Sequence, residues 1–267
     1  MSAAKVTFRC TRCEQGVTTG EHDATPACLN CGRRYPRQNG ITVLRTEGGG
    51  DELSNYPDEV YDLLASVESR HFWFVERNRL IIATLRRALG PLSGRSALDI
   101  GCGIGLAHRY LSGIGELHGV DASEVSIGRA REDNPEIAYA VADASSLPYD
   151  DAAFDVSFAV GLLHHVPPES RDAVVRELVR VARVLTVVFE HNPLNPLTRL
   201  AVDRCAFDED AVLLGPREVC RLLRRVGAQP LEQRYILFFP RRGNALRRVE
   251  DVLRRVPLGA QYYVAAR

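Results

Sequence analysis

The sequence predicts a doubly wound α/β protein, on the evidence of three features of its 267 residues. Short apolar runs alternate with helical patterns from residue 96 onward, which is typical of a parallel sheet covered by helices on both faces. The run at residues 184–189 is almost wholly apolar or β-branched, as expected of a strand buried on both sides. A glycine-rich turn directly follows the first apolar run, where such sheets bind their ligands.

Seven segments carry the predicted strands, and helical patterns lie between them. The strands are expected at residues 97–100, 116–120, 137–142, 154–160, 184–189, 231–239 and 261–265. Helices are expected at residues 106–111, 168–182, 217–226 and 244–256, with one more after Ser123, whose hydroxyl suits an N-cap. A long helical pattern also precedes the sheet, from Pro57 to about Leu89.

The composition is that of an ordinary globular protein. Hydrophobic residues make up 45% of the chain and charged residues 25%, which is enough to fill a sizeable core. The formal net charge at pH 7 is zero, so no overall field favours nucleic acid or an anionic membrane. No apolar run approaches the ~20 residues that a spanning helix needs, and the first ten residues lack the apolar core of a secretory signal. We therefore expect a cytoplasmic protein without a transmembrane segment.

The N-terminal part of the chain contains two C-x-x-C pairs. Cys10 and Cys13 are separated by 14 residues from Cys28 and Cys31. Four thiolates in two such pairs suit tetrahedral zinc and leave no open position for catalysis. A redox pair and an iron–sulfur cluster are the alternatives, but the βαβ setting of a thioredoxin-like motif is absent. We expect a structural zinc site here, in a module too small to bury a core without the metal.

A change in composition marks the expected domain boundary. Residues 47–51 are polar and glycine-rich, as in a flexible linker. We therefore divide the chain into a zinc-ribbon module at residues 1–46, closed by a strand at residues 41–44, and a larger domain at residues 47–267.

The glycine-rich turn has an unusual spacing. Gly101, Gly103 and Gly105 recur at every second position, and Asp99 lies two residues ahead of the first. Glycine accepts φ > 0 and lets a ligand approach the backbone, but a dinucleotide fingerprint would be spaced G-x-G-x-x-G. An acid beside the turn suits a cofactor that carries positive charge better than it suits a pyrophosphate. At this point the sequence resembles the class I S-adenosylmethionine-dependent methyltransferases, whose first motif is an acid followed by G-x-G-x-G.

Two further acids follow the second and third predicted strands. Asp121 lies 22 residues beyond Asp99, where a carboxylate can accept hydrogen bonds from ribose hydroxyls in such folds. Asp143 ends the third strand, where the resemblance implies a contact with the adenine amino group. The adjoining Ala122 and Ala144 complete the expected S-adenosylmethionine site. The resemblance also implies a Rossmann-like sheet of seven strands, the last of them antiparallel.

Two histidine-containing segments follow the fourth and fifth predicted strands. His164 and His165 lie in a segment that resembles the equivalent motif of methyltransferases acting on quinones and natural products. His191 lies in the sequence Glu-His-Asn-Pro-Leu-Asn-Pro, which resembles a signature of a bacterial subgroup of these enzymes. Because an imidazole titrates near neutral pH, His165 or His191 is a candidate general base for the acceptor's proton. The alternative for each is that it holds the acceptor or fixes a loop.

Four ring-bearing side chains follow one another at residues 71–74. They cannot all lie on one face of a helix, so some must point away from the main core. Packing between this helix and the sheet is one interpretation. The other is that Trp73 or Phe74 forms the roof of the cofactor or acceptor pocket.

We therefore expect a zinc ribbon followed by a methyltransferase that acts on a small-molecule acceptor such as a sugar, a quinone or a secondary metabolite. One alternative is an rRNA guanine methyltransferase that binds RNA through a basic face of the ribbon. The zero net charge makes nucleic acid the less favoured partner, because RNA affinity depends on neutralising phosphates. The other alternative is a non-catalytic methyltransferase fold that docks a protein partner through the ribbon.

Overall fold

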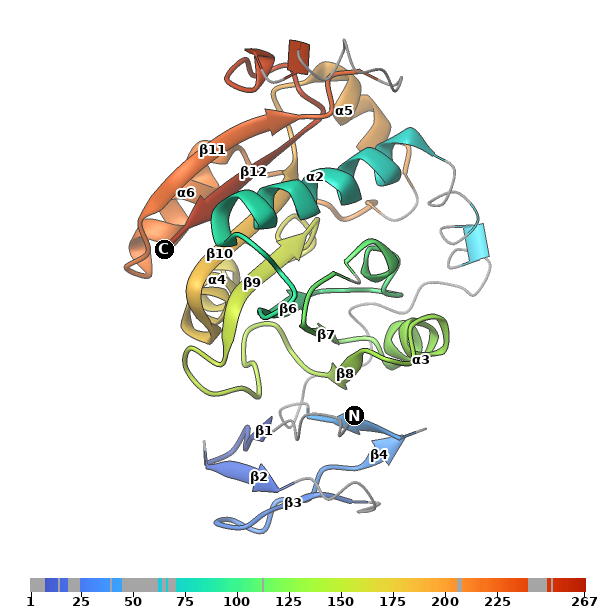
Figure 1. Ribbon diagram of the computed structural model, residues 1–267, viewed down its shortest axis with the longest axis vertical. Helices are drawn as coiled ribbons and strands as arrows, with labels where there is room; N and C mark the ends of the chain where they lie inside the picture. Colours follow the sequence, from blue (N-terminus) through green and yellow to red (C-terminus); the bar gives the residue numbers. More distant parts are fainter. Residues whose placement is uncertain are drawn as a thin grey trace.

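A nine-stranded sheet forms the frame of the protein in the computed structural model (Figure 1). The strands follow the order β11-β12-β10-β9-β6-β7-β8-β5-β4 across the sheet. Their bounds are β4 (Arg37–Gln38), β5 (Ile41–Val43), β6 (Ser96–Ile100), β7 (Glu116–Asp121), β8 (Ala138–Val141), β9 (Phe154–Val160), β10 (Ala182–His191), β11 (Pro230–Ile236) and β12 (Gln261–Ala266). The structure describes residues 8–13, 15–18, 25–38, 40–44, 62–63, 66, 71–111, 113–205, 208–239, 249–250 and 252–267.

The direction of the strands is that of a Rossmann-like fold. The strands from β10 to β5 run parallel to one another. Strand β12 is antiparallel to both of its neighbours, β10 and β11. All seven predicted strands are present, although β11 ends at Ile236 instead of residue 239. The predicted α/β sheet with an antiparallel last strand is confirmed.

Helices cover both faces of the sheet. They are α2 (Phe72–Leu89), α3 (Glu124–Asp133), α4 (Arg171–Val181), α5 (Pro196–Val202) and α6 (Pro216–Arg225), together with the 3-10 turn η2 (His108–Tyr110). As predicted, Ser123 caps α3, because its hydroxyl oxygen accepts a hydrogen bond from the N–H of Ser126 at 3.1 Å. No helix in the described part of the chain is long and apolar enough to cross a membrane.

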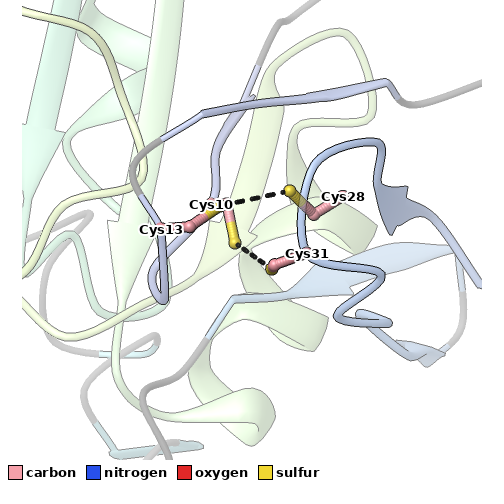
Figure 2. A group of neighbouring side chains, drawn as sticks. All are labelled: Cys10, Cys13, Cys28 and Cys31. Atoms are coloured by element: carbon pink, nitrogen blue, oxygen red, sulfur yellow. Dashed lines mark hydrogen bonds between the residues drawn. The ribbon is translucent and has the colours of Figure 1, made fainter.

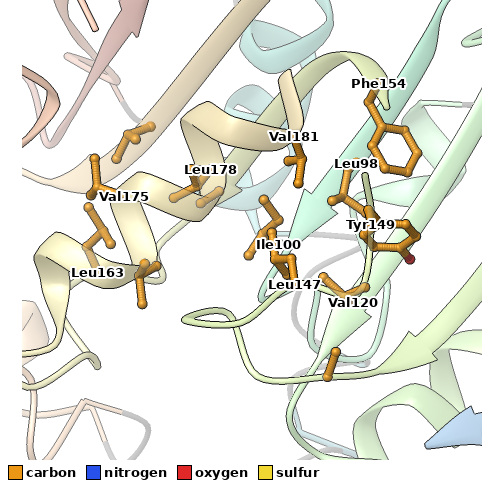
Figure 3. Close-up of a cluster of buried hydrophobic side chains, with 14 of the residues drawn as sticks. Leu98, Ile100, Val120, Leu147, Tyr149, Phe154, Leu163, Val175, Leu178 and Val181 are labelled. Atoms are coloured by element: carbon orange, nitrogen blue, oxygen red, sulfur yellow. The ribbon is translucent and has the colours of Figure 1, made fainter. Parts of the chain in front are cut away.

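Two apolar clusters hold the helices against the sheet. On one face, Leu178 of α4 is fully buried in a cluster with Leu98 and Ile100 of β6 (Figure 3). On the opposite face, Ile81 and Leu85 of α2 are fully buried in a second cluster with side chains of the central strands. Each such side chain contributes about 1.5–3 kcal/mol by leaving water. The sheet is therefore a rigid frame for the residues that follow its strands.

The segment after the glycine turn differs from the prediction. Instead of a helix at residues 106–111, it forms only the single 3-10 turn η2. Gly101, Gly103 and Gly105 have φ values of +72°, +53° and +68°, so the chain cannot enter a right-handed helix before residue 106. His108 within η2 is buried and contacts Asp99, which fixes the short turn against the sheet.

The helical pattern expected between residues 57 and 89 is interrupted. Helix α2 begins at Phe72 because His71 is extended, with φ −74° and ψ 129°. Of the earlier part, residues 62, 63 and 66 are described, and they are helical. The helix expected at residues 244–256 also lies largely outside the described residues, of which 249, 250, 252 and 253 are helical.

Helix α5 is absent from the sequence prediction. Asn195 begins it by accepting hydrogen bonds from the N–H groups of Leu197 and Thr198, and Pro196 occupies its first position. These are good start signals. The helix is only 7 residues long, however, which is too short to show a helical period in the sequence.

The N-terminal module contributes two strands to the main sheet. Strand β5 pairs in parallel with β8, through Thr42 and Ala140 and through Val43 and Val141. The strand predicted to close the ribbon thus extends the large sheet, where it satisfies the backbone groups of the β8 edge. The rest of the module forms a small sheet of β1 (Phe8–Arg9), β2 (Gly16–Thr18) and β3 (Ala27–Cys28). The boundary expected between residues 46 and 47 lies outside the described residues and stays a prediction.

Candidate active site

The glycine turn lies at the carboxyl end of β6, in the middle of the sheet. The N–H groups of Gly101 and Cys102 both bind the carbonyl of Val120 on β7, at 2.8 and 3.0 Å. A Cβ atom on Gly101 would lie 2.6 Å from Cδ1 of Leu162, which belongs to the loop after β9. Glycine is therefore required at residue 101 both by its positive φ and by this close contact. The contact also brings the turn against the segment that carries His164 and His165.

Asp121 lies at the end of β7 with both carboxylate oxygens already engaged. Oδ2 accepts a hydrogen bond from the N–H of Gly103 at 2.9 Å, and Oδ1 accepts one from the N–H of Ser123 at 2.9 Å. Burial raises the pKa of Asp121, while these two backbone N–H groups act in the opposite direction. A carboxylate has about four acceptor positions, so each oxygen can still accept a further hydrogen bond, for example from a ribose hydroxyl.

Asp99 is buried at the base of the same turn. Its Oδ2 contacts Nε2 of His108 at 3.0 Å, and Nδ1 of that ring contacts the hydroxyl of Tyr139 at 2.7 Å. The other oxygen, Oδ1, is buried and has no hydrogen-bond partner among the described residues. An unpaired buried carboxylate oxygen is unfavourable. A ligand that brings a cationic donor, such as the ammonium group of S-adenosylmethionine, would satisfy it, so this site fits that cofactor.

Asp143 follows β8, and its side chain organises the next residues. Oδ1 accepts hydrogen bonds from both the N–H and the hydroxyl of Ser145, each at 2.8 Å. Asp143 and Ala144 are half-buried, as are Asp121 and Ala122 at the end of the neighbouring strand. Because β6, β7 and β8 are adjacent, all the residues predicted to bind the cofactor lie along one edge of the sheet.

A buried ion cluster surrounds His164, which follows β9. Nδ1 of His164 contacts Oε2 of Glu190 at 2.6 Å, and Nε2 lies 3.3 Å from Oδ1 of Asp208. The second oxygen of Glu190 accepts the N–H of Leu163 at 2.7 Å. Burial alone would lower the pKa of His164, but the two carboxylates raise it to about 9. Glu190 and Asp208 therefore favour the charged form of His164.

The two histidines predicted as bases lie on either side of this ring. The ring of His165 lies 4.1 Å from that of His164, and the ring of His191 lies 4.9 Å from it. Burial and the positive charge on His164 lower the pKa of both to about 4. The side chain of His165 is 35% exposed, so it is partly open to solvent. The structure thus brings His164, His165 and His191 together, although they come from two different strand ends.

One aromatic side chain of the 71–74 run reaches this cluster. The ring of Trp73 lies 5.7 Å from that of His191. Phe74 instead packs against Arg77 of its own helix, with the guanidinium carbon 5.0 Å from the ring centre. Trp73 therefore lies beside the histidines and also packs against the second apolar cluster, and its role as the roof of a pocket stays a prediction.

Two residues of the site, Asp208 and Arg171, are not predicted from the sequence. Asp208 comes from the irregular segment after α5. Arg171 is buried in α4, where its guanidinium group donates to the carbonyls of Leu163, Val166 and Val212 at 3.1, 3.0 and 2.7 Å. It ties the histidine loop to the segment after α5. No local pattern marks either residue, because each acts only through contacts between distant segments.

The four cysteines of the N-terminal module lie together (Figure 2). The sulfur atoms of Cys10 and Cys31 are 3.6 Å apart and those of Cys13 and Cys28 are 3.5 Å apart. All four sulfur atoms lie within 4.8 Å of one another. Zinc bonds of about 2.3 Å in a tetrahedron would separate the sulfurs by about 3.8 Å. The arrangement therefore fits a closed, four-thiolate zinc site, as a zinc ribbon requires.

Comparison with known proteins finds similarity to methyltransferases over part of the chain. Residues 98–186 match the sequence model of the family described as a methyltransferase domain. The chain is 34% identical over 151 residues to the 27-O-demethylrifamycin SV methyltransferase of Amycolatopsis mediterranei, an alignment that covers 50% of this chain and 55% of that protein. It is 31% identical over 159 residues to the demethylmenaquinone methyltransferase of Clavibacter sepedonicus, covering 57% of this chain and 61% of that one.

A solved structure shows the same fold. The magnesium protoporphyrin IX methyltransferase of Synechocystis, with S-adenosylhomocysteine bound, superimposes with a TM-score of 0.52 at 18% identity, over 72% of this chain and 81% of that one. Together with the family match, this shows that the larger domain has the fold of a methyltransferase domain. The chain spans little more than half the length of its two relatives.

Proposed function

We propose that this chain is a class I S-adenosylmethionine-dependent methyltransferase that transfers a methyl group to a small-molecule acceptor held beside the His164 cluster. One observation carries the proposal. Asp99, Asp121 and Asp143 lie at the ends of three adjacent parallel strands, and Asp99 keeps a buried oxygen without a partner among the described residues. An edge with three acids and a glycine turn fits a cofactor with an ammonium, two ribose hydroxyls and an adenine amine.

Different residues of the site bind different parts of the cofactor. Asp121 accepts from the ribose hydroxyls, while Asp143, with Ala122 and Ala144 around it, holds the adenine. Asp99 and the glycine turn face the amino-acid part. When bound, S-adenosylmethionine supplies the sulfonium methyl group. The chain's own contribution is mainly to align the acceptor with that group, which removes much of the entropic barrier.

The acceptor side has two histidines that can take a proton. His164 is already engaged by Glu190 and Asp208, so it is not the base. His165 is partly exposed to solvent, and the ring of His191 lies next to those of His164 and Trp73. We propose that one of these two accepts the proton that leaves the acceptor as the methyl group arrives.

The N-terminal module is proposed to hold structural zinc through Cys10, Cys13, Cys28 and Cys31. A reducing compartment keeps such thiols free for the metal, so we expect the chain to work in the cytoplasm. The ribbon is also the surface on which a protein partner would dock. RNA remains the less favoured partner, because the formal net charge of the chain is zero and RNA affinity depends on neutralising phosphates.

A transfer assay tests this proposal. The chain would be incubated with S-adenosylmethionine labelled in its methyl group and with separate panels of quinones, sugars, polyketides and rRNA. We expect label on a small molecule, a loss of at least 100-fold in rate with His191→Ala or His165→Ala, and no change with the exposed control Asp150→Asn. Label on rRNA, or salt-sensitive RNA binding, would support the RNA alternative instead. If the cofactor binds but no compound in any panel becomes labelled, the result would support the alternative of a non-catalytic methyltransferase fold.

A further inference from the structure

The contacts between Asp208 and the two neighbouring histidines are at the long end of the hydrogen-bond range. Oδ1 of Asp208 lies 3.3 Å from Nε2 of His164 and 3.5 Å from Nε2 of His165. A well-formed hydrogen bond of this kind has a length of about 2.7–3.2 Å. One carboxylate oxygen thus faces two imidazole nitrogens, and its distance to each nitrogen is longer than that range. All three atoms lie within 4.8 Å of one another.

Such distances match the edges of a coordination shell. Nitrogen and carboxylate oxygen bind first-row divalent ions at about 2.0–2.2 Å, so two ligands of one ion are separated by about 3.0–3.5 Å. The opposite nitrogen of His164 contacts Glu190 at 2.6 Å, with both groups buried. A histidine that binds a metal commonly donates its other N–H to a carboxylate in this way, which fixes the ring and increases its basicity.

We propose that His164, His165 and Asp208 form a binding site for a divalent transition-metal ion of the zinc type, oriented by Glu190. Two imidazoles and one carboxylate leave coordination positions open. Because the ring of His165 is partly exposed, the site is accessible from solvent on that side. This site is separate from the four cysteines, which are complete in themselves.

The metal site gives the acceptor a defined chemical class. This step rests on the proposed function: the open position binds an acceptor hydroxyl, phenolic or aliphatic, through its oxygen. The metal lowers the pKa of that hydroxyl, its O–H bond breaks, and the proton passes to His191. The oxygen then forms a bond to the methyl carbon as the bond between carbon and sulfur breaks. The metal keeps its oxidation state throughout, and S-adenosylhomocysteine leaves with the sulfur electron pair.

The placement of the cluster agrees with this role. The loop that carries His164 and His165 packs directly on the glycine turn, because Leu162 occupies the space that a side chain at Gly101 would need. Arg171 and the hydrogen bond from the N–H of Val212 to the carbonyl of His164, at 2.8 Å, hold the Asp208 segment against that loop. The proposed metal therefore lies beside the cofactor edge and not at the outer surface.

Cobalt(II) titration of the full chain tests the metal site. The chain would first be loaded with one equivalent of zinc, which fills the four cysteines. Cobalt(II) would then be added and followed by visible absorption and by calorimetry. We expect one further equivalent to bind, with a d–d band but no sulfur charge-transfer band. His165→Gln and Asp208→Asn should each weaken binding by more than tenfold, and Glu190→Gln by 10–100-fold. The control Asp210→Asn removes an exposed carboxylate from the same segment and should bind as the native chain does.

Two results would overturn the proposal. The first is that no second equivalent of cobalt(II) binds, in which case the cluster is an ion network around a charged His164 only. The second is binding that persists unchanged in both His165→Gln and Asp208→Asn. Because His165 is partly exposed, its variant is expected to fold, and a retained zinc equivalent in the cysteine site confirms that. Binding of S-adenosylmethionine is measured separately, so failure of the metal site and failure of the proposed function are distinguishable.

Discussion

Removal of zinc from the N-terminal module is predicted to weaken cofactor binding at the sheet edge that carries Asp99, Asp121 and Asp143, although none of the four zinc-site cysteines lies there. The module and the loop after Asp143 share a hydrophobic cluster, in which the ring of Phe8 lies 5.8 Å from that of Tyr149. The N–H of Arg9, next to the ligand Cys10, donates to the carbonyl of Pro148 at 2.8 Å. At the other side of the loop, the N–H of Leu44 donates to the carbonyl of Val141 at 2.8 Å.

The size of the effect follows from those two backbone bonds. Each contributes about 1 kcal/mol, so their loss removes about 2 kcal/mol from the ordered state of the segment that carries Asp143. If binding of S-adenosylmethionine has to restore that order, its Kd rises about 30-fold. A polar cleft of about 380 Å³ lies between the Cys10 turn and the loop after Asp143, and its lining includes Cys10, Thr11, Ser145 and Ser146. We expect this cleft to widen at the same time.

Calorimetry with Cys28→Ser, and with the native chain after chelation, would measure this coupling. Cys205→Ser is the matched control, because that cysteine is half-buried and lies outside the four-sulfur cluster. Amide hydrogen exchange at residues 141–149 would show the accompanying loss of order. A zinc-free chain that keeps its circular dichroism spectrum and binds S-adenosylmethionine with unchanged Kd would refute the reasoning.

Three further predictions concern the frame of the site. Gly101→Ala places a Cβ atom at a φ of +72° and 2.6 Å from Leu162, so it should weaken cofactor binding at least tenfold. The control Gly227→Ala has a φ of +87° but open space around it, so it should only lower the stability of the fold by about 1 kcal/mol. Equal effects of the two variants on cofactor binding would contradict this prediction. Arg171→Met leaves three carbonyls without their donor and should lower the free energy of unfolding in urea by about 3 kcal/mol; a change below 1 kcal/mol would be inconsistent with a clamp. Burial alone would raise the pKa of Asp155, but the Arg183 guanidinium and the Ser96 N–H outweigh it, so the pKa is lowered overall. The Asp155 carboxylate therefore stabilises the fold above its unfolded pKa of about 4. That contribution is lost as the pH falls below this value. Asp155→Asn should therefore flatten the acid side of the curve of stability against pH, and an unchanged slope between pH 5 and pH 3 would exclude the effect.

The cofactor edge could be predicted from the sequence because its signals are local. Asp99, Asp121 and Asp143 each end an apolar run, and parallel strands bring such ends to one edge of a sheet. The spacing of the glycines likewise follows from a backbone requirement that the structure confirms at residues 101, 103 and 105. The two C-x-x-C pairs are local signals too, and the four sulfur atoms meet as expected.

The acceptor side could be predicted only in part, because it is built from contacts between distant segments. The sequence brings His165 and His191 forward as single residues, but nothing in it shows that Asp208 lies between two histidines or that Glu190 orients His164. The pairing of β5 with β8 is hidden for the same reason, since residues 42 and 140 are far apart in the chain. The 3-10 turn at His108 replaces a helix because a buried contact to Asp99 outweighs a weak local preference.

Binding of S-adenosylmethionine itself is the most direct test of the central claim. Isothermal titration calorimetry of the native chain should show one site per chain. Asp121→Ala should weaken binding by at least tenfold, since it removes the proposed acceptor of the ribose hydroxyls and leaves the Gly103 N–H without a partner. Asp150→Asn, an exposed acid nearby, should leave the isotherm unchanged. Absence of binding to the native chain, or equal Kd values for the native chain and Asp121→Ala, would contradict the account.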